Sequence, residues 1–117
     1  MKTFRLALVV LTVGLLCVGN AAGQDEKKSE SDAFEATLAR AKDGDTGAMF
    51  GLGVMYANGE GVIEDAVEAY AWINVAAAKG QKEAAEHRDK IKKTMTPEQI
   101  AEGQKRSREI MKSISKN

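Results

Sequence analysis

Apolar residues recur every three or four positions along most of the chain, which is the spacing of one face of an α-helix. The first such stripe consists of Phe34, Leu38 and Ala41. A second consists of Ala48, Leu52, Met55 and Tyr56. A third consists of Ala66, Ala69, Tyr70, Ile73, Ala76 and Ala77, with Trp72 at its flank. Because no run of β-branched residues alternates with polar ones, the pattern predicts no strand.

Capping residues and glycines set the limits of the first three helices. Asp43-Gly44 ends a helix over 32–42, and Asp45 or Thr46 caps one that runs to residue 57. Gly59 ends that helix and is expected to have a positive φ. Asp65 caps the third helix, with Glu68 in the position of a capping box, and Gly80 ends it.

Two more helices follow. One runs over 82–94, with Ala84 and Ile91 facing inward. The last starts at Pro97, between Thr96 and Gln99 of a second capping box, and ends near residue 115. Its inward residues are predicted to be Ile100, Ile110, Met111 and Ile114, and Gly103 is expected to weaken it. Because the connections are short, the chain is predicted to be all-α, with about five antiparallel helices.

The helices repeat at an offset of 36 residues. This offset places Gly44 on Gly80 and Ala48 on Ala84, and it places an aromatic residue, Phe34, on Tyr70. Beyond Gly80 the similarity fades, so the second unit resembles a cap. The chain is therefore predicted to hold one full repeat at about 45–80, within a helical domain over 32–115.

The run from Ala48 to Gly80 resembles a Sel1-like repeat (SLR), a relative of the tetratricopeptide repeat. The matching residues are Leu52, Gly53, Tyr56, Gly59, Gly61, Val62, Asp65, Ala69, Trp72, Ala76, Ala77 and Gly80. Residues 95–104 resemble the closing segment of small single-repeat bacterial proteins of this kind, except at Gly103. The resemblance implies an αα-hairpin solenoid that binds a protein partner, often in the bacterial envelope.

The first 23 residues are typical of a secretory signal peptide. Lys2 and Arg5 precede an uncharged apolar stretch over 6–18, and Ala21, Ala22 and Gly23 follow it. Cleavage near Gly23 predicts a periplasmic or secreted chain with no membrane anchor, and a flexible segment over 24–31. Retention as an anchor is the alternative. The single cysteine, Cys17, follows two leucines and leaves with the signal, so neither lipidation nor a disulfide is expected.

Charge and composition argue against several kinds of site. Without residues 1–23 the chain has 15 basic and 17 acidic residues, which is not the profile of a nucleic-acid-binding protein. The charge is nevertheless divided, since 24–81 holds 5 basic and 11 acidic residues and 82–117 holds 10 and 6. The segment 43–45 lacks the ligands of a calcium loop, and His87 alone cannot form a zinc site. No metal or cofactor is expected.

The glycines at 51–61 could suggest a nucleotide-binding loop, but the third glycine and the preceding strand of a dinucleotide motif are missing. Gly51 and Gly53 are instead predicted to let the second and third helices approach closely, and Gly59 and Gly61 to form the turn between them.

The string at 113–116 fits S-x-x-K, and 56–58 fits Y-x-N. No K-T-G follows, so a β-lactamase-like hydrolase is only the alternative function.

The sequence thus predicts a non-enzymatic adaptor that binds a protein partner through its helical surface. The residues expected to contact that partner are Tyr56, Tyr70 and Asn74, although both tyrosines also suit the core, as Trp72 does. The partner is not identified. Self-association through an uncapped helix face is a further alternative.

Overall fold

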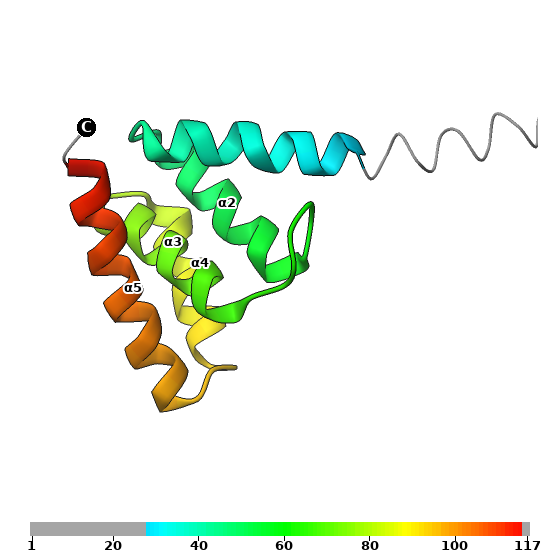
Figure 1. The fold of residues 1–117 in the computed structure, drawn as a ribbon. Coiled ribbons are helices and arrows are strands. Elements are labelled where there is room, and N and C mark those ends of the chain that lie inside the picture. Colours follow the sequence, from blue (N-terminus) through cyan, green and yellow to red (C-terminus); the bar gives the residue numbers. More distant parts are fainter. Residues whose placement is uncertain (1–27, 116–117) are drawn as a thin grey trace, which may run out of the picture.

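The computed structural model describes residues 28–115, and every regular element among them is a helix (Figure 1). An N-terminal helix covers residues 28–42. It is followed by α2 (Thr46–Asn58), α3 (Ala66–Ala78), α4 (Lys82–Lys92) and α5 (Pro97–Ser115). The prediction of five helices and no strand is confirmed for this part of the chain. The expected signal peptide over 1–23 lies outside the described residues.

The N-terminal helix is longer than predicted. Residues 28–31 are already helical, so the flexible segment expected over 24–31 does not extend that far, and 24–27 lie outside the described residues. The polar composition of residues 28–31 suggested a tail, but Lys28 and Glu30 are good helix formers.

Helix α3 is the centre of the domain, because it packs against α2, α4 and α5. Its contacts on several sides explain why more of it is buried than one stripe predicts. Ala71 and Val75 are fully buried in addition to Ala69, Ile73 and Ala76. Trp72 is 4% exposed and belongs to the core, as predicted.

The N-terminal helix packs on the α2 side of the domain. The Phe34 ring meets the Tyr56 ring edge-on, with centroids 5.5 Å apart. A β-carbon at Gly61 would collide with the carbonyl of Glu30 and lie 3.1 Å from the Phe34 β-carbon. The turn after α2 therefore lies directly against the first turns of the N-terminal helix, and only glycine fits at position 61.

The turn geometry supports the repeat offset. Gly44 and Gly80, which the offset aligns, have φ values of 99° and 100°. The aligned Ala48 and Ala84 are both buried, as are Phe34 and Tyr70. The predicted positive φ at Gly59 is present at 71°, and Gly59 closes α2 by donating its backbone N–H to the Met55 carbonyl. The two helix-turn-helix units thus share one local geometry although few of their residues are identical.

One of the two predicted capping boxes is complete. At the start of α5, Thr96 and Gln99 exchange hydrogen bonds of 3.0 and 3.2 Å between backbone N–H groups and side-chain oxygens. At the start of α3, Asp65 accepts the Glu68 N–H at 3.1 Å, but the Asp65 N–H donates to the Tyr56 carbonyl. Glu68 is therefore not needed to close the cap and has another partner, described below.

The two glycines of α2 differ from expectation. A β-carbon at Gly53 would collide with the Ile73 side chain and lie 3.0 Å from the Ala69 carbonyl oxygen, so Gly53 allows α2 and α3 to touch. The same role predicted for Gly51 is wrong. Its nearest neighbour would be the Thr37 methyl group of the N-terminal helix, at an ordinary 3.8 Å.

Candidate functional site

Tyr70, one of the three residues predicted to contact a partner, is a core residue. Its side chain is 2% exposed, and a β-carbon at Gly103 of α5 would collide with its ring. Gly103 does not interrupt α5, which continues to Ser115. The departure from the expected closing segment at this position therefore makes room for Tyr70, and the ring is not presented at the surface.

Asn74 also takes part in the contact between α3 and α5. Its amide donates to Ser107 Oγ at 3.1 Å. Ser107 is 3% exposed and lies within hydrogen-bond distance of the Gly103 carbonyl at 2.9 Å and the Ala71 carbonyl at 3.2 Å. The Asn74 amide thus satisfies a buried hydroxyl within the domain, so its side chain has an internal role.

Tyr56 is the third predicted partner residue, and it is half-buried beside Phe34. Burial raises the pKa of its hydroxyl above 10.0, and the negative charge of Glu68 adds to the shift. The residue lies on α2, whereas Tyr70 and Asn74 contact α5. The structure does not bring the three residues together at one surface.

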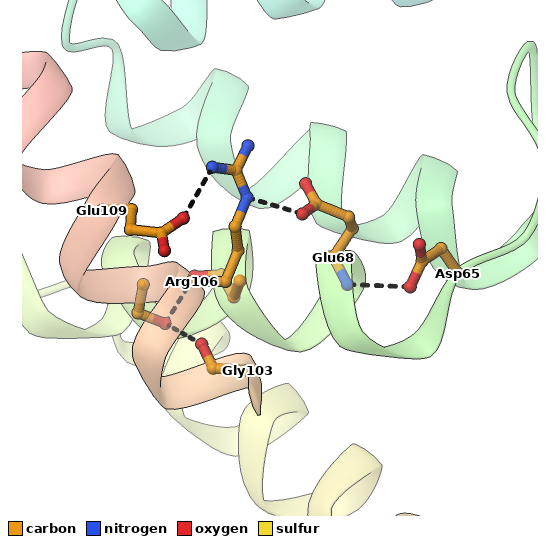
Figure 2. A network of polar contacts seen from close by, with 7 residues as sticks. Asp65, Glu68, Gly103, Arg106 and Glu109 are labelled. Atoms are coloured by element: carbon orange, nitrogen blue, oxygen red, sulfur yellow. Dashed lines mark hydrogen bonds and ion pairs between the residues drawn. The ribbon is translucent and has the colours of Figure 1, made fainter. Parts of the chain in front are cut away.

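A polar network joins α3 to α5 (Figure 2). Arg106 Nε donates to Glu68 Oε1 at 2.6 Å, and Arg106 Nη1 donates to Glu109 Oε2 at 3.3 Å. Partial burial lowers the pKa of Arg106, but the bonds to Glu68 and Glu109 outweigh it, and the net shift is upward. These residues hold α5 in place, and their charges are satisfied within the domain.

A different pair of side chains lies side by side at the surface, between α2 and α4. The rings of Phe50 and His87 meet edge-on with centroids 5.0 Å apart. Phe50 is half-buried and His87 is exposed. By helical spacing, the residues one turn away on either side are Gly47 and Val54 on α2, and Glu83 and Lys90 on α4. We call this surface the α2–α4 face.

The α2–α4 face combines the features of a protein-binding surface. Aromatic side chains are frequent anchors of binding energy, and the pair lies among residues of both charge signs. Val54 is half-exposed, and the glycine at 47 leaves the helix backbone accessible. The face is therefore the candidate site of the described chain.

Residues 28–115 show no other site chemistry. They contain no group of three or more side chains that could hold a metal ion, and no pocket. No helix in this range is long and apolar enough to cross a bilayer. Ser113 of the S-x-x-K string is near the end of α5, its Lys116 lies outside the described residues, and the Asn58 amide of the Y-x-N string donates to Glu60.

The sequence and the fold were compared with those of known proteins. No family model matches the sequence, and no curated protein matches it. Among solved structures, the chain is similar to c5321, a protective antigen present in uropathogenic Escherichia coli strains that displays an SLR fold. The TM-score is 0.70 at 27% sequence identity, and the match covers 73% of this chain and 18% of that one. This chain thus spans less than a fifth of that protein's length.

The fold and this match define an all-helical protein of the αα-repeat class. With the motif from Leu52 to Gly80, they support a Sel1-like repeat protein. Folds of this class are protein-interaction modules built from stacked helix pairs, and their surfaces bind other proteins.

The pairing of Phe50 with His87 was not predicted from the sequence, although a signal for it was present. They are separated by one residue more than the repeat offset, and equivalent positions in successive repeats lie next to each other in a solenoid. The contact between Phe50 and the exposed His87 depends on how α2 and α4 are placed by α3.

Proposed function

We propose that this chain is a non-catalytic adaptor of the bacterial envelope that binds a protein partner through the α2–α4 face. The observation that carries the proposal is the SLR fold, which extends over 73% of the chain. An interaction module needs a surface rather than a reactive centre. The residues predicted from sequence as contacts are largely used inside the domain, which directs attention to the face with Phe50 and His87.

The chemistry of the face defines the kind of partner. An apolar side chain of the partner would lie against Phe50 and Val54 and remove their exposed carbon atoms from water. Glu83 and Lys90, one turn on either side of His87, would pair with charges of the opposite sign at the edge of the contact. A folded partner or an amphipathic helix with a small apolar centre and a mixed polar rim fits this description.

The N-terminal segment supports the compartment. A basic start, an uncharged apolar stretch over 6–18 and small residues at 21–23 are the parts of a cleavable export signal. The exported protein is expected to begin near Gln24. The intact mass of protein recovered from the envelope of the native host tests this, since a mass that includes residues 1–23 would show that the segment is retained.

Site-specific photo-crosslinking tests the binding face. A photo-reactive amino acid at Val54 should crosslink to a discrete protein partner in the native envelope. The same amino acid at Ala39, which is exposed on the N-terminal helix, is the matched control and should not. Equal crosslinking from both positions, or none from Val54, would contradict the assignment of the face.

An activity assay separates the adaptor from the alternative hydrolase. The exported protein should not turn over nitrocefin, a chromogenic β-lactam. Turnover that disappears on Ser113→Ala would establish the alternative and contradict the adaptor.

A further inference from the structure

Two large apolar side chains are exposed among residues 28–115, and they lie on different sides of the domain. Ile63 is 89% exposed in the connection between α2 and α3, and Met111 is 42% exposed on α5. Figure 1 shows this connection and α5 on opposite flanks. Met111 was expected to face inward with Ile110, but only Ile110 is buried.

The surroundings of Ile63 are acidic. Glu60, Glu64 and Asp65 lie in the same connection, and all three are exposed. Gly61 brings this connection against the backbone of Glu30 in the N-terminal helix, whose side chain is exposed as well. Ile63 is thus an exposed apolar side chain among carboxylates. We call this surface the acidic end.

The surroundings of Met111 are basic. Lys105, Arg108 and Lys112 are spaced three and four residues apart, so they form one stripe along α5, and Met111 lies one turn after Arg108. All three are exposed, and none of them forms an ion pair within residues 28–115. The neighbouring Arg106 is different, because Glu68 and Glu109 neutralise it. We call this stripe with Met111 the basic end.

The two ends are complementary to each other. Within residues 28–81 there are 4 basic and 9 acidic residues, and within 82–115 there are 9 basic and 6 acidic residues. Each end presents one apolar side chain with charges of a single dominant sign near it. Opposite surfaces that match in this way favour a contact between different faces of two identical chains, which is a heterologous contact.

We propose that the acidic end of one copy docks on the basic end of a second copy, so that the chains associate head to tail. Ile63 contacts Met111 of the next copy, and Glu64 lies opposite Arg108. The association uses neither Phe50 nor His87, so it is independent of the proposed partner face.

The contact is expected to be weak and dependent on salt. Each end is small, and most of the attraction comes from exposed charges, which physiological salt screens within about 8 Å. Sedimentation velocity of the exported protein should therefore give a mass that rises above that of the monomer as concentration increases at low salt, and that falls back at high salt.

Charge reversal tests the direction of the contact. Arg108→Glu alone and Glu64→Lys alone should each weaken self-association by at least about tenfold, because each places like charges opposite one another. An equimolar mixture of the two variants should associate again. The reversed basic end of one variant then meets the reversed acidic end of the other, and the two unchanged ends also meet. The matched controls are Glu86→Lys and Lys92→Glu, which are exposed on α4 and should associate as the parent does.

Two results would overturn the proposal. One is a parent protein that stays monomeric at every concentration in low salt. The other is a mixture that associates no better than its two components, with circular dichroism showing both variants folded. Crosslinking of a protein partner at Val54 does not depend on either result, so the two proposals can fail separately.

Discussion

Ile73 of α3 lies directly over Gly53 of α2, in the space that a β-carbon at position 53 would occupy. The contact lets the backbones of the two helices approach, and Ile73 is fully buried beneath it. The repeat motif places leucine before this glycine, and Leu52 is also fully buried. The Leu-Gly pair therefore supplies one core side chain and one gap for the facing helix.

Gly51 and Gly53 should respond in opposite ways to alanine. Gly53→Ala should lower the free energy of unfolding by about 1 to 3 kcal/mol, because the new methyl group overpacks the contact with Ile73. Gly51→Ala has room beside Thr37 and should raise the free energy of unfolding by up to about 1 kcal/mol through helix propensity. Urea denaturation of both variants measures this. A destabilised Gly51→Ala would contradict the packing described for α2.

Gly103 should be equally sensitive, through Tyr70. Gly103→Ala is expected to cost about 1 to 3 kcal/mol of stability because the added methyl group meets the Tyr70 ring, despite alanine's better helix propensity. Tyr70→Leu removes that ring, so the cost of Gly103→Ala should be smaller in the Tyr70→Leu background. Additive effects in the double variant would show that the ring and the glycine are not in contact.

The ion pair between Glu68 and Arg106 should be measurable, since Glu68 is only 20% exposed at its side chain. A double-mutant cycle with Glu68→Gln and Arg106→Gln should give a coupling of about 0.5 to 1 kcal/mol at low salt, decreasing as salt is added. The control is the Arg88–Asp89 pair, which is 66% exposed at Asp89 and should couple less. Equal coupling in both cycles would contradict a specific role in holding α5.

Asp45 predicts a pH dependence at the start of α2. Hydrogen bonds from Arg40, at 2.8 and 3.2 Å, and from the Ala48 backbone hold the pKa of this carboxyl below 3.8. Because the pKa of Asp45 is lower in the folded state than in the unfolded state, the ionised carboxyl stabilises the fold above pH 3.8. This contribution is lost as the pH falls through the pKa of the folded state. The melting temperature of the parent should therefore exceed that of Asp45→Asn at neutral pH.

The difference should shrink in acid. The Asp45→Asn variant retains a cap acceptor in its side-chain amide but cannot form the charged pair with Arg40, so the contribution of that side chain does not titrate. A difference in melting temperature that stays constant between about pH 6 and about pH 3 would contradict the role of Arg40.

The sequence predicted the helices, the turns and the repeat, because each depends on neighbouring residues. Thr96 and Gln99 cap α5 through hydrogen bonds between residues three positions apart. Gly44 and Gly80 both have a positive φ, which glycine adopts readily. The prediction of the fold also rested on local spacing, since Leu52, Gly53 and Trp72 have the spacing of the repeat motif within one helix pair.

The surface was harder to predict because it depends on how the helices are placed. Tyr70 suited either core or surface until Gly103, 33 residues away, was seen to leave space for its ring. The sequence placed Glu68 in a capping box, but in the structure the Asp65 N–H donates to the Tyr56 carbonyl. The Glu68 carboxylate instead accepts a hydrogen bond from Arg106. The Phe50–His87 contact needs both α2 and α4 to be positioned by α3.

Affinity for the captured partner tests most directly whether this repeat binds a protein through the α2–α4 face. Isothermal titration should compare the parent with Val54→Arg on the face and Ala39→Arg on the N-terminal helix, both at half-exposed or exposed positions. Val54→Arg should weaken binding by at least about tenfold, or about 1.4 kcal/mol, and Ala39→Arg should bind as the parent does. Equal affinity of all three proteins would contradict it.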